Sequence, residues 1–146
     1  EQVVFETWAL NEASVEKASR ERSLEVAIEV DGRPISTFGC DGVVMSTPTG
    51  STAYSFSARG PIVAPEHQAL VLTPVSPHML FDRSLILNPD AVIRVEVVGH
   101  RPATLSVDGR NLGELREGDV AIPAGTPMSA AAVGVAVALV IPAIRR

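Results

Sequence analysis

Residues 41–57, DGVVMSTPTGSTAYSFS, combine a short apolar run with a dense series of turn-forming residues. The apolar run at 43–45 is followed by eight consecutive small or turn-forming residues, 46–53. Hydroxyl residues are typical caps at the start of a helix, and Gly60-Pro61 is a typical stop signal. The pattern therefore predicts a strand, a loop and one short helix over about 51–58.

The dominant hydrophobic period in the rest of the chain is two, which indicates β-strands. Apolar and polar residues alternate over 24–30, 93–97 and 104–107, and Asp-Gly turn signals follow the first and last of these segments. A return strand is expected over 34–40 and a last strand over 115–122. We therefore predict a mainly-β domain, a β-sandwich of antiparallel strands with one short helix after the TPTGSTAY loop.

Composition and charge exclude several classes of function. The chain has 146 residues, of which 46% are hydrophobic, so it has the size and the apolar content of one domain or one lobe of a larger protein. The net charge is −5 and Lys and Arg never form a run longer than two, which argues against a nucleic-acid partner. The single cysteine, Cys40, cannot form an internal disulfide, so a cytoplasmic location is expected.

The end of the chain is unusually apolar. Residues 128–144, MSAAAVGVAVALVIPAI, contain 17 residues without a charge. This length falls short of a typical membrane-spanning helix. The segment is open to interpretation as a buried strand, an atypical tail or a membrane element, and we predict no membrane partner. We accordingly divide the chain into a β-sandwich domain at 1–122 and an apolar Ala/Val-rich tail at 123–146.

Two interpretations of the loop at 46–53 stay open on its residues alone. A strand, a Gly/Ser/Thr loop and a helix start direct backbone N–H groups at one point, which suits a phosphate or another anion. However, the spacing and the lysine of a Walker motif are absent, and a capped helix after a surface loop explains the same residues. Asn11 and Glu12 supply adjacent donors and acceptors, and Asp41 supplies a carboxylate beside the loop, although all three also suit turns.

Other catalytic and metal-binding templates fail. The three histidines, His67, His78 and His100, are scattered without ligand spacing, so no metal site is predicted. The Ser-x-x-Lys pattern that starts at Ser14 lacks the partner motifs of serine acylases.

Four stretches, in this order and at this spacing, resemble the carboxy-terminal domain of bacterial NAD kinases. They are LNEAS at 10–14, DGVVMSTPTGSTAYSFSARGPIV at 41–63, LVLTPVSPHMLFDRSLIL at 70–87 and SVDGR at 106–110. The resemblance extends from about Phe5 to about Ile122. The second stretch looks like the signature of that domain.

The resemblance implies a function and a set of binding residues. The family transfers a phosphate from ATP or polyphosphate, with Mg²⁺, to the 2′-hydroxyl of the adenosine ribose of NAD, giving NADP. Its carboxy-terminal β-sandwich supplies much of the NAD pocket, and its members form homo-oligomers, commonly dimers or tetramers. The positions that match its NAD contacts are Asn11, Glu12, Arg22, Asp41, Thr49, Thr52, Ala53, Tyr54 and Ser57.

The sequence also departs from the family. The Gly-Gly-Asp-Gly motif, which carries the catalytic aspartate in an amino-terminal domain, does not occur in these 146 residues, so we expect no catalytic residue in this chain and no activity of the chain alone. Arg59 and Ser84 stand where the family usually has Gly and Pro. The alternative is a non-catalytic nucleotide-binding or oligomerisation β-domain derived from the same family.

Overall fold

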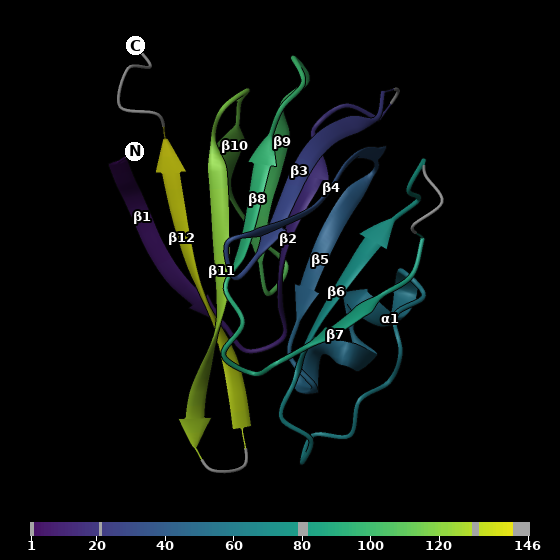
Figure 1. Cartoon of the computed structure of the whole chain (residues 1–146), viewed down its shortest axis with the longest axis vertical. Helices are drawn as coiled ribbons and strands as arrows, with labels where there is room; N and C mark the ends of the chain where they lie inside the picture. The colour runs from purple at the N-terminus through teal and green to yellow at the C-terminus, as the bar shows by residue number, and fades with distance from the viewer. Residues whose placement is uncertain (1, 21, 79–81, 130–131, 142–146) are drawn as a thin grey trace.

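Two six-stranded antiparallel sheets form the fold, which is known from a computed structural model that describes residues 2–20, 22–78, 82–129 and 132–141 (Figure 1). The strands of the first sheet, in order across it, are β1 (Gln2–Ala9), β12 (Ala132–Ile141), β11 (Val120–Ser129), β8 (Ile93–Val97), β3 (Leu24–Val30) and β4 (Arg33–Cys40). Those of the second sheet are β10 (Arg110–Leu115), β9 (Ala103–Val107), β2 (Glu12–Lys17), β5 (Gly42–Ser46), β6 (Leu70–Val75) and β7 (Leu85–Leu87).

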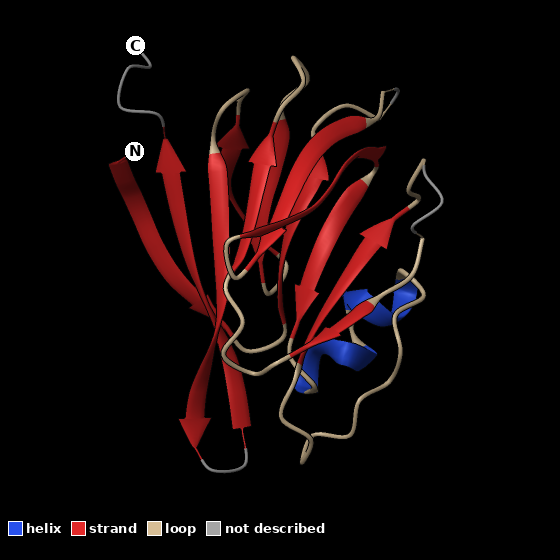
Figure 2. Cartoon of the chain, in the orientation of Figure 1, coloured by secondary structure: helices blue, strands red, loops and turns tan. Residues whose placement is uncertain are grey.

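Helical structure in the described residues is confined to the segment that follows β5, as Figure 2 shows. A 3₁₀ turn, η1 (Thr49–Thr52), leads into a single-turn helix, α1 (Tyr54–Ser57). The predicted mainly-β sandwich with one short helix after the TPTGSTAY loop is therefore confirmed.

The β3–β4 hairpin follows from its sequence. Leu24 pairs with Cys40 at one end and Val30 with Arg33 at the other. Between the strands Asp31 and Gly32 both have positive φ, 52° and 79°. Asp-Gly is the residue pair that two-residue hairpin turns favour for this conformation, so the turn predicted from the sequence is confirmed.

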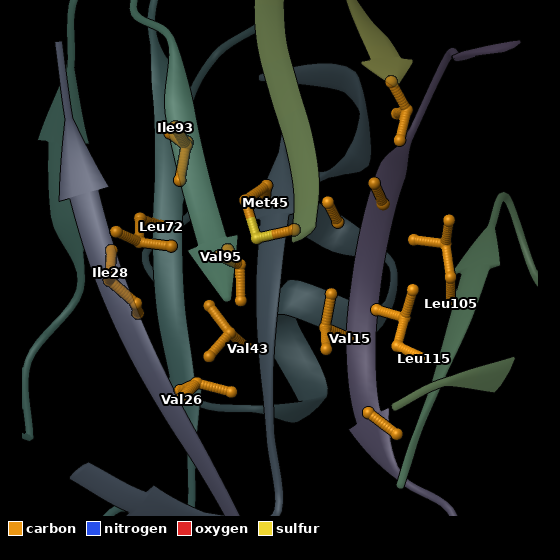
Figure 3. Close-up of a cluster of buried hydrophobic side chains, with 14 of the residues drawn as sticks. Val15, Val26, Ile28, Val43, Met45, Leu72, Ile93, Val95, Leu105 and Leu115 are labelled. Carbon is orange, nitrogen blue, oxygen red and sulfur yellow. The ribbon is translucent and has the colours of Figure 1, made fainter. Parts of the chain in front are cut away.

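The hydrophobic core lies between the two sheets (Figure 3). Val26 and Val95 reach it from the first sheet, and Val15, Val43 and Leu105 reach it from the second. Alternate residues of these strands contribute because successive side chains of a strand point to opposite faces. With few aromatic residues in the chain, β-branched and aliphatic side chains fill the core.

Strand β5 and most of β6 are covered on both faces. All five residues of β5 are buried, and so are the first five of β6. Val43 and Met45 belong to the core cluster, whereas the intervening Val44, which is also fully buried, does not. Strand alternation therefore points Val44 to the outer face of the second sheet, where η1 and α1 pack against β5. A strand buried on both faces reads as a continuous apolar run, which explains VVM.

The carboxy-terminal part differs from the expectation of a last strand over 115–122. Strand β10 ends at Leu115, and Gly118, with φ at 87°, lies in the turn before β11 begins at Val120. That conformation is incompatible with a continuous strand. Strand β11 then runs past residue 122 to Ser129, and the two-part division of the chain stays a prediction.

The apolar segment at 128–144 includes β12, a strand between β1 and β11 (Figure 1). Val135 and Val137 of β12 are buried in the core. The strand interpretation is thus confirmed for 132–141, while 130–131 and 142–144 lie outside the described residues. In the part of the chain that the structure describes, no helix has the length and apolar character needed to cross a membrane.

Candidate functional site

The carboxylate of Asp108 holds the turn that carries Asn11 and Glu12. It accepts hydrogen bonds from the backbone N–H groups of Leu10, Asn11 and Glu12 at 2.8, 2.8 and 3.1 Å. The Asp108 N–H in turn donates to the Glu12 carbonyl at 3.0 Å. Asp108 itself has a φ of 49° in the Asp-Gly turn between β9 and β10. Two turns almost a hundred residues apart in the chain are thus joined at one end of the second sheet.

The loop before η1 packs directly on the same turn. The Thr47 hydroxyl donates to the Leu10 carbonyl at 2.6 Å and accepts from the Gly50 N–H at 3.0 Å, while the Thr47 N–H donates to the Asn11 carbonyl at 2.9 Å. A Cβ added to Gly50 would collide with the backbone of Asn11. Glycine is therefore required at this position by close approach of the two chains.

Glu12 joins this turn to the start of α1. Its side chain is only 6% exposed, and its Oε1 accepts a hydrogen bond from the Tyr54 N–H at 3.2 Å. Burial raises the pKa of the Glu12 carboxyl, the Tyr54 hydrogen bond lowers it, and the charges of Asp108 and Glu16 raise it further. The protein's own carboxylate thus occupies the first N–H of the single-turn α1, so this geometry does not support an external phosphate there.

Glu16 organises the Tyr54 ring. The Tyr54 hydroxyl donates to Glu16 Oε2 at 2.9 Å, and the Ser14 hydroxyl donates to Glu16 Oε1 at 2.9 Å. Burial raises the pKa of the Tyr54 phenol, and the hydrogen bond and charge of Glu16 and the charges of Asp41 and Glu12 add to this effect. The phenol therefore stays protonated at neutral pH and keeps its hydrogen-bond donor.

These groups surround a cavity of about 210 Å³, which we call the Tyr54 cavity. Its lining consists of Glu12, Ser14, Glu16, Tyr54, Ser106 and Gly109. Two carboxylates and three hydroxyls suit a ligand that presents hydroxyl or amine donors, such as a ribose.

Asp41 is half-buried and paired with a lysine. Its carboxylate lies 3.1 Å from Lys17 Nζ, while its backbone bonds to the Lys17 N–H and to the Val75 carbonyl. The charge of Asp41 contributes to the raised pKa of the Tyr54 phenol, so the Lys17–Asp41 pair lies near the end of β2 at which Glu16 holds the Tyr54 hydroxyl. The ion pair fixes the direction of the Asp41 carboxylate and offsets part of the negative charge around Tyr54.

A second cavity, of about 400 Å³, lies at the end of α1, and we call it the Arg59 cavity. Its polar lining residues are Ser57, Arg59, Thr73, Ser76, Asp82 and Ser84.

The remaining residues that the resemblance assigned to NAD binding are spread along the loop and helix. Thr49 and Thr52 are exposed on η1, Ala53 is half-buried between η1 and α1, and Ser57 is exposed at the end of α1, where it lines the Arg59 cavity. Arg22 is exposed in the bend before β3 and belongs to neither cavity lining. The structure thus packs the loop and helix against the Asn11-Glu12 turn, through Gly50 and Tyr54. Asp41 lies at the other end of the β2–β5 pair, beside Lys17.

Sequence reasoning missed Glu16, Lys17 and Asp108 as parts of this region. Glu16 and Lys17 occur only in the rejected Ser-x-x-Lys pattern that starts at Ser14, and Asp108 is predicted only as half of a turn. The alternation of β2 was a usable signal, because Glu12, Ser14 and Glu16 follow one another at a spacing of two and share a face. Within the described residues, His, Cys, Asp and Glu side chains nowhere gather in a group of three or more that would suit a metal ion.

Comparison with known proteins now defines the class. The sequence model of the family described as ATP-NAD kinase C-terminal domain matches residues 10–132. The chain is 59% identical over 120 residues to an NAD kinase of Leifsonia xyli subsp. xyli, covering 81% of this chain and 40% of that protein. It is 56% identical over 117 residues to NAD kinase 2 of Streptomyces coelicolor, covering 80% of this chain and 39% of that protein.

Solved structures agree with this fold. A crystal structure of yeast NADH kinase complexed with NADH has a TM-score of 0.72 and 31% identity, over 91% of this chain and 35% of that chain. An NAD kinase from Archaeoglobus fulgidus in complex with ATP has a TM-score of 0.67 over 92% of this chain and 49% of that chain; at 23% identity it supports the fold alone. The chain belongs to the NAD kinase family, as its carboxy-terminal domain. It spans about two-fifths of the length of the relatives named above.

Proposed function

We propose that this chain is the NAD-binding part of an NAD kinase, the enzyme that phosphorylates the 2′-hydroxyl of the adenosine ribose of NAD with ATP or polyphosphate. The observation that carries the proposal is the position of Tyr54 along β2. Its N–H bonds to Glu12 beside the Asn11 turn, its hydroxyl bonds to Glu16, and Asp41 lies next to that second end of the strand. The family assignment supplies the substrate class, and the carboxylates and hydroxyls that line the Tyr54 cavity are compatible with ribose hydroxyls.

The chemistry of the proposed contacts agrees with their geometry. Glu12 and Asp41 supply acceptors for ribose hydroxyls or a carboxamide, and the Tyr54 ring offers an apolar face to a base. Thr49, Thr52, Ala53 and Ser57 provide hydroxyls and backbone groups along η1 and α1. Arg22 is retained in the proposal on sequence match alone.

Binding of NAD by the purified chain is the direct test. Titration calorimetry should give saturable heat with NAD, and Asp41→Asn and Tyr54→Phe should each weaken binding by roughly tenfold, as loss of one hydrogen bond to a charged or ring-fixing group predicts. Glu66→Gln, an exposed loop carboxylate, is the matched control and should bind normally. No heat at millimolar NAD, or equal binding by all variants, contradicts the proposal.

Catalysis requires, in this proposal, a domain with the Gly-Gly-Asp-Gly motif. ATP with Mg²⁺ provides the phosphate and its charge neutralisation, and we assign no residue of this chain to the metal. The chain alone should form no NADP. Mixing it with a folded Gly-Gly-Asp-Gly domain, ATP and Mg²⁺ should restore NADP formation. If the folded mixture binds NAD without making NADP, the chain is instead a nucleotide-binding or oligomerisation module.

We further propose a homo-oligomer, a dimer or a tetramer, in the cytoplasm. The oligomer is supported by large exposed apolar side chains, among them Trp8, Phe56 and Ile62. Light scattering after size exclusion should give a mass of two or four chains, and a single chain at micromolar concentration would contradict this part of the proposal. The cytoplasmic location is supported by Cys40, a free and buried thiol.

A further inference from the structure

Four non-glycine residues of the described chain have a positive φ, and two of them lie in the same cavity. Asp31 and Asp108 each precede a glycine in a hairpin turn, where aspartate is an ordinary residue. The other two, Arg59 at 73° and Ser76 at 47°, both line the Arg59 cavity. Left-handed backbone at a residue other than Gly, Asn or Asp is uncommon, and such residues gather at functional sites.

The end of α1 explains the conformation of Arg59 but not its residue type. The Arg59 N–H donates to the Phe56 carbonyl at 2.9 Å and the Gly60 N–H donates to the Ser55 carbonyl at 2.7 Å. This pair of hydrogen bonds is a Schellman motif with Arg59 at its left-handed position. Glycine is the usual residue there because it adopts this conformation without strain. Since the backbone favours glycine, we look to the arginine side chain for the reason that arginine occurs at this position.

The lining of the cavity includes, besides Arg59, the hydroxyl residues Ser57, Thr73, Ser76 and Ser84. The Thr73 hydroxyl lies 2.8 Å from that of Ser84 and 3.5 Å from that of Ser55. A Cβ at Gly60 would lie 2.9 Å from Thr73 Oγ1, so the chain after Arg59 passes directly over these groups. The cavity therefore combines a guanidinium with hydroxyl donors in a volume of about 400 Å³, within the range of small-molecule sites.

We propose that the Arg59 cavity binds the phosphate group of a phosphorylated ligand that also carries hydroxyl or amine donors. The guanidinium of Arg59 binds the phosphate, with the hydroxyls of Ser57 and Ser84 as further donors, because a planar fork of N–H groups matches phosphate oxygens. Asp82, on the same lining, accepts from the hydroxyl or amine donors. A local cation is needed because the net charge of the chain is −5 and repels anions at long range.

This inference rests on the proposed function at one point, since Ser57 belongs both to the proposed NAD contacts and to the cavity. It adds a phosphate contact that the family resemblance does not assign. The ligand class is a nucleotide or sugar phosphate rather than a free base or nucleoside.

The test compares AMP with adenosine, which differ by the phosphate. Calorimetric titration of the full chain should give roughly tenfold or more tighter binding of AMP. Arg59→Gly should abolish this preference while keeping the fold, because glycine suits the backbone there. Arg59→Lys should retain part of it, and Arg33→Ala, which removes an exposed arginine of the β3–β4 hairpin, should retain all of it.

Equal binding of AMP and adenosine by the wild-type chain, absence of binding of either, or an AMP preference that survives in Arg59→Gly would each overturn the inference. NAD titration of Glu12→Gln, run in parallel, separates it from the proposed function. If Glu12→Gln loses NAD while Arg59→Gly keeps the AMP preference, the phosphate site is wrong and the NAD proposal stands. If Glu12→Gln keeps its NAD affinity while Arg59→Gly loses the AMP preference, the phosphate site is supported and the NAD proposal is contradicted.

Discussion

At Arg59 the backbone conformation favours glycine, whereas the proposed phosphate contact requires the arginine side chain. Its φ of 73° favours glycine, so Arg59→Gly should raise the free energy of unfolding by about 1 kcal/mol. Ala58→Gly is the matched control, since Ala58 has an ordinary φ of −84° and should lose about 0.5–1 kcal/mol through chain entropy. Urea denaturation followed by circular dichroism measures both. A loss of stability in Arg59→Gly would show that the side chain stabilises the fold.

Glu12 should make stability depend on pH in a defined direction. Because burial raises its folded-state pKa above the ordinary 4.5, the native chain binds this proton more tightly than the unfolded chain. The contribution of Glu12 to stability is therefore fully present below the unfolded-state pKa and is lost as the pH rises through the folded-state pKa.

Glu12→Gln removes this titration and keeps an oxygen for the Tyr54 N–H. The free energy of unfolding of Glu12→Gln, minus that of the wild type, should therefore increase from about pH 4 to about pH 7. Denaturant unfolding at a series of pH values gives this difference directly. A difference that stays constant, or that decreases with pH, would contradict the buried, proton-favouring environment of Glu12.

At the scale of elements, two Asp-Gly turns of similar conformation have different tasks. Asp108 accepts three backbone hydrogen bonds from the β1–β2 turn, whereas Asp31 accepts one, from the Val92 N–H at 2.9 Å. Asp108→Ala should lower the free energy of unfolding by about 3 kcal/mol and Asp31→Ala by about 1–2 kcal/mol, including the strain of alanine at positive φ.

NAD binding should separate these two turns more clearly than stability does. Asp108→Ala releases the turn that carries Asn11 and Glu12, so the proposed NAD affinity should fall, while Asp31→Ala should leave it unchanged. Calorimetry on both variants, under conditions where each remains folded, checks this. Equal affinities would show that Asp108 holds the fold but does not position the proposed site.

Sequence patterns predicted those strands that pair with a neighbour in the chain. The β3–β4 hairpin was predictable because one Asp-Gly turn and strict alternation specify it. Strand β6 gave no such signal, since LVLTPV is buried on both faces and its partner β5 is separated from it by the helical segment. The contacts among Glu12, Glu16, Tyr54 and Asp108 arise from the pairing of β2 with β9 and from the loop that packs against β2. These residues are far apart in the chain, so no local sequence pattern predicts their contacts.

In the molecule as a whole, the residues that stabilise the sandwich and the residues of the proposed binding sites lie in different places. The core lies between the sheets, whereas the Tyr54 and Arg59 cavities lie at turns and on the side covered by η1 and α1. Hydroxyls and carboxylates gather there because strands β2, β6 and β9 present polar residues on the face away from the core, and the loops and α1 add others. Substitutions in the cavities should therefore change binding more readily than folding, with Glu12 as an exception because it joins the β1–β2 turn to α1.

Removing strand β12 tests whether the carboxy-terminal segment is a dispensable tail or a part of the sandwich. It pairs with β1 on one side and β11 on the other, and it buries Val135 and Val137, each contributing about 1.5–3 kcal/mol. A chain ending at Ser129 would lose these contacts and leave β1 without its neighbour, a loss comparable to the total stability of a typical domain. We expect it to lose cooperative thermal unfolding and dispersed amide resonances, while a matched chain ending at Ile141 retains both. A folded chain without β12 would instead identify residues after 129 as a dispensable tail.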